Sequence, residues 1–142
     1  MVSGVDEIQK YAEVDEAIQR CINKFLPGPL TMLLKAKENV PSWVTCNTGI
    51  IGIRIPSNNE ALTLLKTVGK PLLVPSANKA GEKPAMNSKE VKDIFLDELD
   101  YIVEGSAIGG LPTTIVDFTT NNIKILREGP ISLNEILDAM KE

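Results

Sequence analysis

Apolar side chains recur at steps of three and four residues in several parts of the chain, a spacing that places them on one face of a helix. The clearest example runs from Val14 to Phe25 and includes Cys21 on the apolar face. We therefore interpret Cys21 as a small core residue and not as a reactive thiol. Helices are also predicted to begin near Ser3, after Asn58, at Ser88 and at Ser132.

Specific residues mark the ends of two of these helices. Asn58 fits an N-terminal cap, and Gly69 fits the left-handed position that follows the last turn of the same helix. Ser132 and Glu135 have the spacing of a capping box ahead of an apolar run.

Short apolar runs between turn residues predict strands. The run from Pro71 to Pro75 is wholly apolar, as expected of a strand buried on both faces. Residues 120–122 are predicted to form a hairpin turn between two strands. Other strands are predicted after the 27–29 turn and at residues 50–55, 101–104, 113–118 and 123–128. Helices and strands are interspersed, so we expect one α/β domain over residues 1–142, with a twisted mixed sheet flanked by helices.

The composition limits the chemistry that the chain can perform. Its 142 residues contain no histidine, which excludes Ser-His-Asp and Cys-His catalysis within the chain and removes the commonest zinc ligand. The net charge of −4 argues against a generally basic nucleic-acid binder, although a local basic patch is compatible with it. No apolar stretch approaches the roughly 20 residues of a membrane span, no secretory pattern is present, and the two cysteines lack Cys-x-x-Cys spacing. We therefore expect a cytoplasmic protein without a membrane partner.

Arg54 is the first candidate for a binding residue. It lies in an isoleucine-rich strand, and a buried guanidinium without an anionic partner is strongly unfavourable. Two kinds of partner are compatible with the sequence. One is an anionic ligand, and the other is a carboxylate of the protein itself, such as Asp117.

Polar groups at two other predicted strand ends also allow two interpretations. Ser76 and Asn78 either bond the backbone of their own turn, as such residues commonly do, or face a ligand. Arg127 either binds an anion or forms an ordinary surface ion pair.

A glycine-rich stretch precedes two threonines. Gly105, Gly109 and Gly110 either form a backbone nest for an anion or a flexible connection between strands. Thr113 and Thr114 follow at the start of the next predicted strand, where their hydroxyl groups could face the same ligand.

Five segments of the chain together resemble a known family. In chain order they read FLPGPLTMLLKA, GIRIP, PLLVPSANKAGEKP, GGLPTTIVDF and ILREGPIS. In this order and at this spacing they look like the YrdC-type family, whose best-known activity is L-threonylcarbamoyladenylate synthesis. The resemblance covers nearly the whole chain, and five ordered segments are far more specific than any one of them. It implies a YrdC-like fold with a concave face where the polar strand ends meet.

The resemblance also implies a reaction and its partners. The family condenses L-threonine, bicarbonate or carbon dioxide, and ATP into threonylcarbamoyl-AMP and pyrophosphate, and Mg²⁺ is expected to offset the charge of the triphosphate. The threonylcarbamoyl group then passes to an adenosine of tRNA with the help of transfer proteins. The implied macromolecular partners are therefore tRNA or double-stranded RNA and the threonylcarbamoyl-transfer proteins.

Six residues match positions that bind substrate in the family. The implied roles are nucleotide contact for Ser76, Asn78 and Arg127, carboxylate or phosphate contact for Arg54, and contact with the threonine and carbamoyl region for Thr113 and Thr114. They are expected to share one cleft, with Ser76 within roughly 15 Å of Arg127. Adenylyl transfer needs positioning and charge neutralisation more than a strong base, which suits a site without histidine.

The chain departs from the family's pattern in three places. It has no Pro-Thr-(Glu/Asp)-Thr-x-Tyr-Gly-Leu block and no Lys-x-Arg, Ala80 stands where a serine is usual, and Ile50 stands where a threonine is frequent. Because Lys-x-Arg is the family's main phosphate-neutralising pair, we expect a chain that is incomplete at the N-terminus and binds ATP weakly. Supplying a Lys-x-Arg segment should then restore synthesis. An uncovered sheet edge would favour a homodimer or aggregation.

Three other functions stay open. A nucleotide- or RNA-binding module without catalysis would need a local basic surface, which Lys79, Lys83, Lys89 and Lys92 could form. The carbamoyl-transfer domain of hydrogenase maturation proteins is disfavoured, because those chains are much longer and carry zinc-finger cysteines that are absent here. The last is a folded fragment with no activity of its own.

Overall fold

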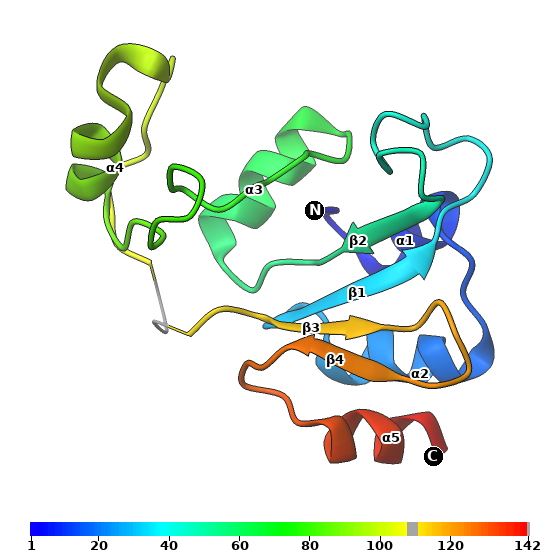
Figure 1. Ribbon diagram of the computed structural model, residues 1–142. Coiled ribbons are helices and arrows are strands. Elements are labelled where there is room, and N and C mark those ends of the chain that lie inside the picture. Colours follow the sequence, from blue (N-terminus) through cyan, green and yellow to red (C-terminus); the bar gives the residue numbers. More distant parts are fainter. Residues whose placement is uncertain (108–110, 142) are drawn as a thin grey trace. The chain divides into compact units, whose positions relative to one another are not determined.

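Four short strands form the sheet. A computed structural model of the protein describes residues 1–107 and 111–141. Its strands are β1 (Leu30–Lys35), β2 (Ile50–Ile53), β3 (Thr114–Asp117) and β4 (Lys124–Arg127), in the spatial order β2-β1-β3-β4. β1 pairs antiparallel with β2 and parallel with β3, and β3 pairs antiparallel with β4. The sheet is mixed, as predicted, and β3 and β4 are the two strands of the predicted hairpin (Figure 1).

The chain divides into two compact units. The sheet unit comprises Met1–Leu73 and Pro112–Glu142, and the insert unit comprises Val74–Leu111. The sheet unit holds the four strands together with α1 (Val5–Tyr11), α2 (Glu16–Phe25), α3 (Asn59–Val68) and α5 (Leu133–Lys141). The insert unit holds α4 (Ser88–Phe95) and the 3₁₀ turn η1 (Leu96–Glu98). Among the described residues, no helix is long and apolar enough to cross a membrane. The prediction of one domain over residues 1–142 stays a prediction.

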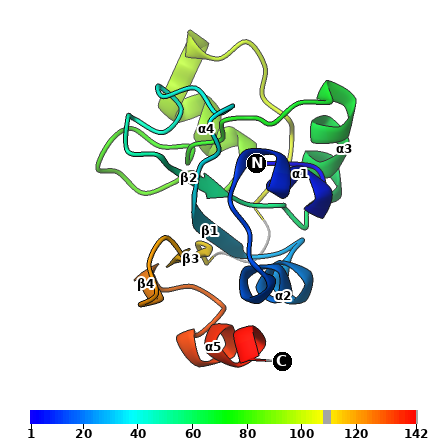
Figure 2. The ribbon, with the colours of Figure 1, turned by 90° about the vertical axis from the view of Figure 1, so that its right-hand side faces the viewer.

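The core of the sheet unit lies between one face of the sheet and the helices α1, α2 and α5. In β1, Leu30, Met32 and Leu34 are buried while the residues between them are not, so alternate side chains point into the core. In the view of Figure 2, α1 and α2 lie on the same side of β1. Burying each aliphatic side chain contributes roughly 1.5–3 kcal/mol, so an aliphatic core can hold this unit together. The helices contribute Ile8, Ile18, Cys21, Ile22, Ile136 and Ala139 to it.

Hydrogen bonds at the helix ends confirm the predicted caps. Asn58 accepts the backbone N–H of Ala61 at 2.9 Å, and Gly69 takes the left-handed conformation with φ of 66° after α3. At α5, the backbone N–H of Ser132 donates to the carboxylate of Glu135 at 2.8 Å, and the N–H of Glu135 donates back to Ser132 Oγ at 3.4 Å. An N-terminal cap stabilises a helix by roughly 1 kcal/mol, which fixes where α3 and α5 begin.

Polar contacts are prominent in the insert unit. Lys79 pairs with Glu98 at 2.6 Å and lies 5.4 Å from the centre of the Phe95 ring, and Lys92 pairs with Glu104 at 2.7 Å. No described side chain of this unit is buried. Exposed ion pairs contribute about 0–1 kcal/mol each, so the unit has little internal stability of its own.

Two strand predictions are wrong. Residues 71–75 and 101–104 belong to none of the strands in the described parts of the chain. Leu73 is 67% exposed and Tyr101 is 81% exposed, whereas a strand covered on both faces would bury both side chains. The first run also begins and ends with proline, which lacks the N–H that a central strand donates to its neighbour.

The burial of the two cysteines predicts different reactivity. Cys21 is buried, its thiol donates to the carbonyl of Ile136 at 3.7 Å, and burial raises the pKa of this thiol to about 11. Cys46 is exposed. At neutral pH we expect a colorimetric thiol reagent to label one thiol of the native protein rapidly and the second only after denaturation. Cys46→Ser should abolish the rapid phase, and two rapid thiols in the native protein would contradict the burial of Cys21.

Candidate anion-binding site

Two arginines lie at one end of the sheet. Arg54 directly follows Ile53, which pairs with Met32 near the start of β1. Arg127 is the last residue of β4 and pairs with Ile115 near the start of β3. Because β1 and β3 are parallel and begin side by side, both arginines lie at the amino-terminal ends of these two strands. The topology therefore places two cations that are far apart in the sequence at the same end of the sheet, one beside each of its outer strands.

Arg54 is held by a backbone carbonyl. Its Nε donates to the carbonyl oxygen of Gly28 at 3.2 Å, and the side chain is partly buried. Burial lowers the pKa of Arg54, and the nearby charge of Arg127 lowers it further. In the described parts of the chain neither arginine forms an ion pair.

Asp117 is not the partner of Arg54. Its Oδ1 accepts the backbone N–H of Thr119 at 2.8 Å and the hydroxyl of the same residue at 2.6 Å. The structure therefore excludes Asp117 as the ion-pair partner of Arg54. This favours an anionic ligand as the partner of Arg54.

Arg127 is bound to Thr113 and not to a carboxylate. Its Nε donates to the carbonyl of Thr113 at 3.0 Å, and its Nη2 donates to Thr113 Oγ1 at 2.8 Å. The same hydroxyl lies 2.9 Å from the hydroxyl of Thr31 in β1. We call Arg54, Arg127, Thr113 and Thr31 the arginine cluster. Thr31 is not among the predicted binding residues, because nothing in a strand pattern indicates which hydroxyl of a neighbouring strand will contact Thr113.

Thr114 is placed differently from Thr113. It is 0% exposed, its hydroxyl donates to the carbonyl of Ile131 at 3.0 Å, and it accepts the N–H of Ile131 at 2.9 Å. These two bonds commit the hydroxyl to the chain itself. The geometry therefore gives Thr114 a structural role, while Thr113 belongs to the arginine cluster.

The charge of the cluster has no described counter-charge. Like charges repel, and the charge of Arg127 contributes to the lowered pKa of Arg54. A bound anion would relieve this repulsion. In the described structure, Nη1 and Nη2 of Arg54 have no hydrogen-bond partner, so its planar fork is available to a carboxylate or a phosphate.

Ser76 and Asn78 lie in the insert unit. The N–H of Asn78 donates to the carbonyl of Ser76 at 3.0 Å, and its Nδ2 donates to the carbonyl of Lys79 at 2.9 Å, so the segment bonds its own turn. Asn78 Oδ1 is nevertheless buried and has no partner within the described chain. Both interpretations therefore describe part of this turn. The N–H and Nδ2 donors of Asn78 bond the turn itself, and its Oδ1 acceptor is left for another group.

Other predicted groups of this region contribute less. Gly105 has φ of 147°, and Gly109 and Gly110 lie outside the described residues, so the predicted nest stays a prediction. Lys79 and Lys92 are already paired with glutamates, which reduces the basic surface that an RNA-binding module would need.

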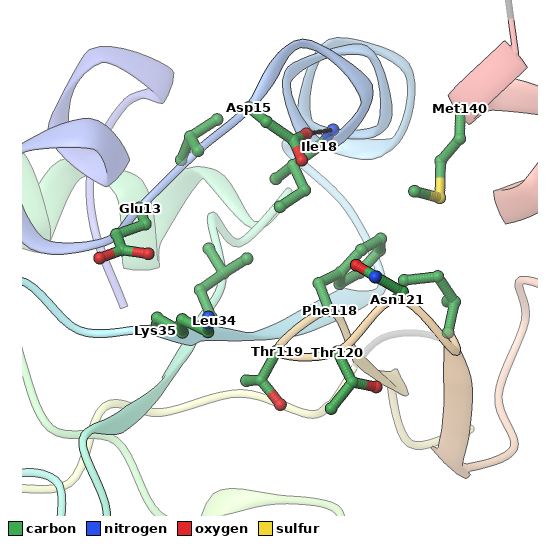
Figure 3. Close-up of a pocket in the computed structure, with 12 residues that line it drawn as sticks. Glu13, Asp15, Ile18, Leu34, Lys35, Phe118, Thr119, Thr120, Asn121 and Met140 are labelled. Atoms are coloured by element: carbon green, nitrogen blue, oxygen red, sulfur yellow. Dashed lines mark hydrogen bonds between the residues drawn. The ribbon is translucent and has the colours of Figure 1, made fainter.

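A separate pocket of about 470 Å³ lies at the opposite end of the parallel strand pair. Leu34 near the end of β1, Phe118 after β3, and Met140 of α5 are among its walls (Figure 3). Asp15 at its rim caps α2, accepting the N–H of Ile18 at 2.8 Å. None of the six predicted binding residues lines this pocket, so it is distinct from the arginine cluster.

Comparison with known proteins identifies the family. The model of the family that includes Sua5, YciO and YrdC, described as telomere recombination, matches residues 1–129. The chain belongs to the Sua5/YciO/YrdC family. The predicted resemblance to YrdC-type proteins is therefore confirmed, and the sheet and helices described above are the family's fold.

Named members of the Sua5/YciO/YrdC family include threonylcarbamoyl-AMP synthases. The threonylcarbamoyl-AMP synthase of Pyrococcus abyssi is 30% identical over 137 residues, which make up 95% of this chain and 40% of that protein. The crystal structure of P. abyssi Sua5 complexed with L-threonine has a TM-score of 0.91 at 28% identity, and the match covers 97% of this chain and 41% of that one. The crystal structure of Escherichia coli YciO has a TM-score of 0.87 at 30% identity, covering 96% of this chain and 67% of that one. In the sequence comparison, the chain spans 64% of E. coli YciO.

Replacing Arg54 tests the arginine cluster directly. We expect Arg54→Ala to weaken the binding of inorganic pyrophosphate on the order of 10- to 100-fold, because hydrogen bonds to charged groups contribute about 1.5–3 kcal/mol. Arg54→Lys should not restore affinity, since lysine cannot both hold the Gly28 carbonyl and present a planar fork. Isothermal titration calorimetry measures both effects. Arg20→Ala is the matched control, because Arg20 bonds the carbonyl of Met140 and takes no part in the cluster. Unchanged affinity in Arg54→Ala would make Arg54 a purely structural residue.

A second test separates the two adjacent threonines. Thr113→Val should weaken pyrophosphate binding with little loss of stability, because its hydroxyl belongs to the cluster. Thr114→Val should lower the free energy of unfolding by about 1–3 kcal/mol, because it leaves the buried N–H and carbonyl of Ile131 without their partner. Denaturant unfolding and calorimetry on the two variants compare these effects. The reverse pattern would show that Thr114, and not Thr113, faces the ligand.

Proposed function

We propose that the arginine cluster is the anion-binding part of a threonylcarbamoyl-AMP synthase site, which acts on ATP, L-threonine and bicarbonate. One observation carries the proposal: Arg54 and Arg127 lie at the same end of the sheet, where the charge of Arg127 contributes to the lowered pKa of Arg54, and the described chain offers neither of them an ion-pair partner. Membership of a family with named threonylcarbamoyl-AMP synthases supports this reading of the cluster.

The chemistry of the cluster suits the substrates. In the proposed reaction bicarbonate takes up a proton and loses water to give carbon dioxide. The nitrogen of L-threonine then bonds to the carbon of carbon dioxide and loses a proton. An oxygen of the resulting carbamate then bonds to the α-phosphorus of ATP, while the bond from that phosphorus to pyrophosphate breaks. Negative charge accumulates on the leaving pyrophosphate, and guanidinium groups already fixed by the chain stabilise it without reorganisation. The free fork of Arg54 equally fits the carboxylate of L-threonine.

Mg²⁺ does not fit the side chains of this cluster. The cluster consists of cations and hydroxyl groups, and no group of three or more metal-binding side chains occurs among the described residues. Magnesium prefers carboxylate and phosphate oxygens, so the proposal assigns no step to a metal held by this chain.

The proposed product determines the class of partner. Threonylcarbamoyl-AMP is an activated mixed anhydride, so a transfer protein that delivers the acyl group to tRNA would consume it. We include tRNA and such transfer proteins in the proposal on the basis of this chemistry alone.

A pyrophosphate-release assay tests the function. Because the sequence contains no Lys-x-Arg, we expect the chain alone to release little pyrophosphate. With a Lys-x-Arg segment supplied and ATP, L-threonine and bicarbonate present, we expect release that stops when either L-threonine or bicarbonate is omitted and falls at least tenfold in Arg54→Ala, the effect of one lost charged contact of about 1.4 kcal/mol. Calorimetric titration with L-threonine accompanies the assay. Binding of ATP and L-threonine without release would instead identify a binding module, and the absence of both would reject the proposed function.

A further inference from the structure

Gly129 lies directly against the backbone that carries Thr113. A Cβ atom at this position would lie 2.7 Å from the carbonyl oxygen of Pro112 and 2.7 Å from the carbonyl carbon of Thr113, whereas ordinary contacts begin at 3.4 Å, and it would also meet the backbone nitrogen of Thr114. These neighbours are backbone atoms and cannot swing aside. The segment after β4 can therefore approach residues 112–114 this closely only with glycine at position 129.

The contact at Gly129 lies between two pairs of hydrogen bonds. Two residues earlier, Arg127 donates twice to Thr113, at 3.0 and 2.8 Å, and two residues later Ile131 exchanges two bonds with Thr114. A side chain at position 129 would push the segment away by several tenths of an ångström at the midpoint of these bonds. The two bonds of Arg127 would then approach or exceed the distance at which a hydrogen bond is lost.

Gly28 has the same relation to Arg54. Its carbonyl accepts from Arg54 Nε at 3.2 Å, and its N–H donates to the carbonyl of Ile55 at 3.0 Å, so it bonds both residues that follow the end of β2. Gly28 is buried, and a Cβ there would overlap the carbonyl of Phe25. Each arginine is thus anchored to a backbone segment whose position depends on a glycine.

We infer that Gly28 and Gly129 are positioning residues of the anion site, which set the places of Arg54 and Arg127 without touching the ligand. This inference rests on the proposed function of the arginine cluster. It adds two glycines to the site. Because neither has a side chain, the backbone can approach closely enough to anchor Arg54 and Arg127 at one end of the sheet, where an anion can bind them. Folding, and not ligand binding, therefore supplies the free energy needed to order the two guanidinium groups and to overcome their repulsion.

The test follows the arginine side chains and the affinity together. The chain has three arginines, so the Nε–H signals of Arg20, Arg54 and Arg127 form a small set in a nitrogen-15 NMR spectrum. Arg20 Nε donates to the carbonyl of Met140 and serves as the internal reference. In Gly129→Ala we expect the Arg127 signal to shift while that of Arg20 stays, and the Kd for inorganic pyrophosphate to rise about tenfold. Gly4→Ala is the matched control, since a Cβ there meets nothing within 4 Å.

A double-mutant cycle distinguishes positioning from general destabilisation. If Gly129 acts through Arg127, then in the Arg127→Ala background Gly129→Ala should change the pyrophosphate Kd by less than about twofold. Equal effects of Gly129→Ala in both backgrounds, or full affinity with an unshifted Arg127 signal, would overturn the inference. Should Gly129→Ala fail to fold, Gly28→Ala with Arg54→Ala provides the same cycle and the same readings. Failure of the unmodified chain to bind pyrophosphate would reject the anion site itself, and with it both the proposed function and the inference.

Discussion

Thr114 is the residue through which the amino-terminal ends of the parallel strands are joined. Its N–H donates to the carbonyl of Pro29 at 2.9 Å, next to the start of β1, and its hydroxyl exchanges two bonds with Ile131 ahead of α5. Thr114 and Ile131 are both buried, so leaving the bonding groups of either residue unpaired would be unfavourable. Hydrogen bonds of Thr114 therefore join three segments that are distant in the sequence, those of Pro29, Thr114 and Ile131. The residues of the arginine cluster lie next to these joined segments.

This framework explains how two like charges can be held together. Neither guanidinium forms an ion pair within the described chain, so the cluster by itself opposes folding through desolvation and repulsion. The backbone bonds around Thr114 and the aliphatic core beneath it supply the compensating stability. Binding sites commonly retain such unfavourable local arrangements, because the interaction with the ligand removes them.

Local sequence signals predicted some parts of this structure well. Asn58, Gly69 and the capping box of Ser132 act over three or four residues, so they could be recognised without knowledge of the fold. The mixed sheet also agrees with expectation, while a shared binding site of Arg54 and Arg127 stays a prediction. Resemblance to a family supplied the grouping of these residues, because no pattern in the chain states that residues 54 and 127 converge.

The wrong strand predictions concern segments whose structure depends on contacts with residues distant in the sequence. The apolar runs at 71–75 and 101–104 have strand composition, but a run becomes a strand only when a neighbour accepts and donates its backbone bonds along its length. In the first run only Leu72 exchanges such bonds, with Met1, and neither run belongs to a strand of the described chain. The distinction between Thr113 and Thr114 is of the same kind. Adjacent residues of a strand point to opposite faces, so one hydroxyl meets Arg127 and the other meets Ile131, and the sequence does not reveal which.

Both anchors of the cluster also explain why its cations are arginines. Arg54 and Arg127 each use Nε to donate to a backbone carbonyl, of Gly28 and of Thr113 respectively. The guanidinium group carries further N–H groups on its terminal nitrogens, so one side chain can be fixed by the protein and still bind an anion. Lysine has a single ammonium group at the end of a flexible stem, and an anchor there would occupy the same group that must face the ligand. The close backbone approaches at Gly28 and Gly129 bring those carbonyls to where the two Nε atoms can reach them. Both terminal nitrogens of Arg54 and Nη1 of Arg127 are thereby left for the ligand, while Nη2 of Arg127 bonds the hydroxyl of Thr113.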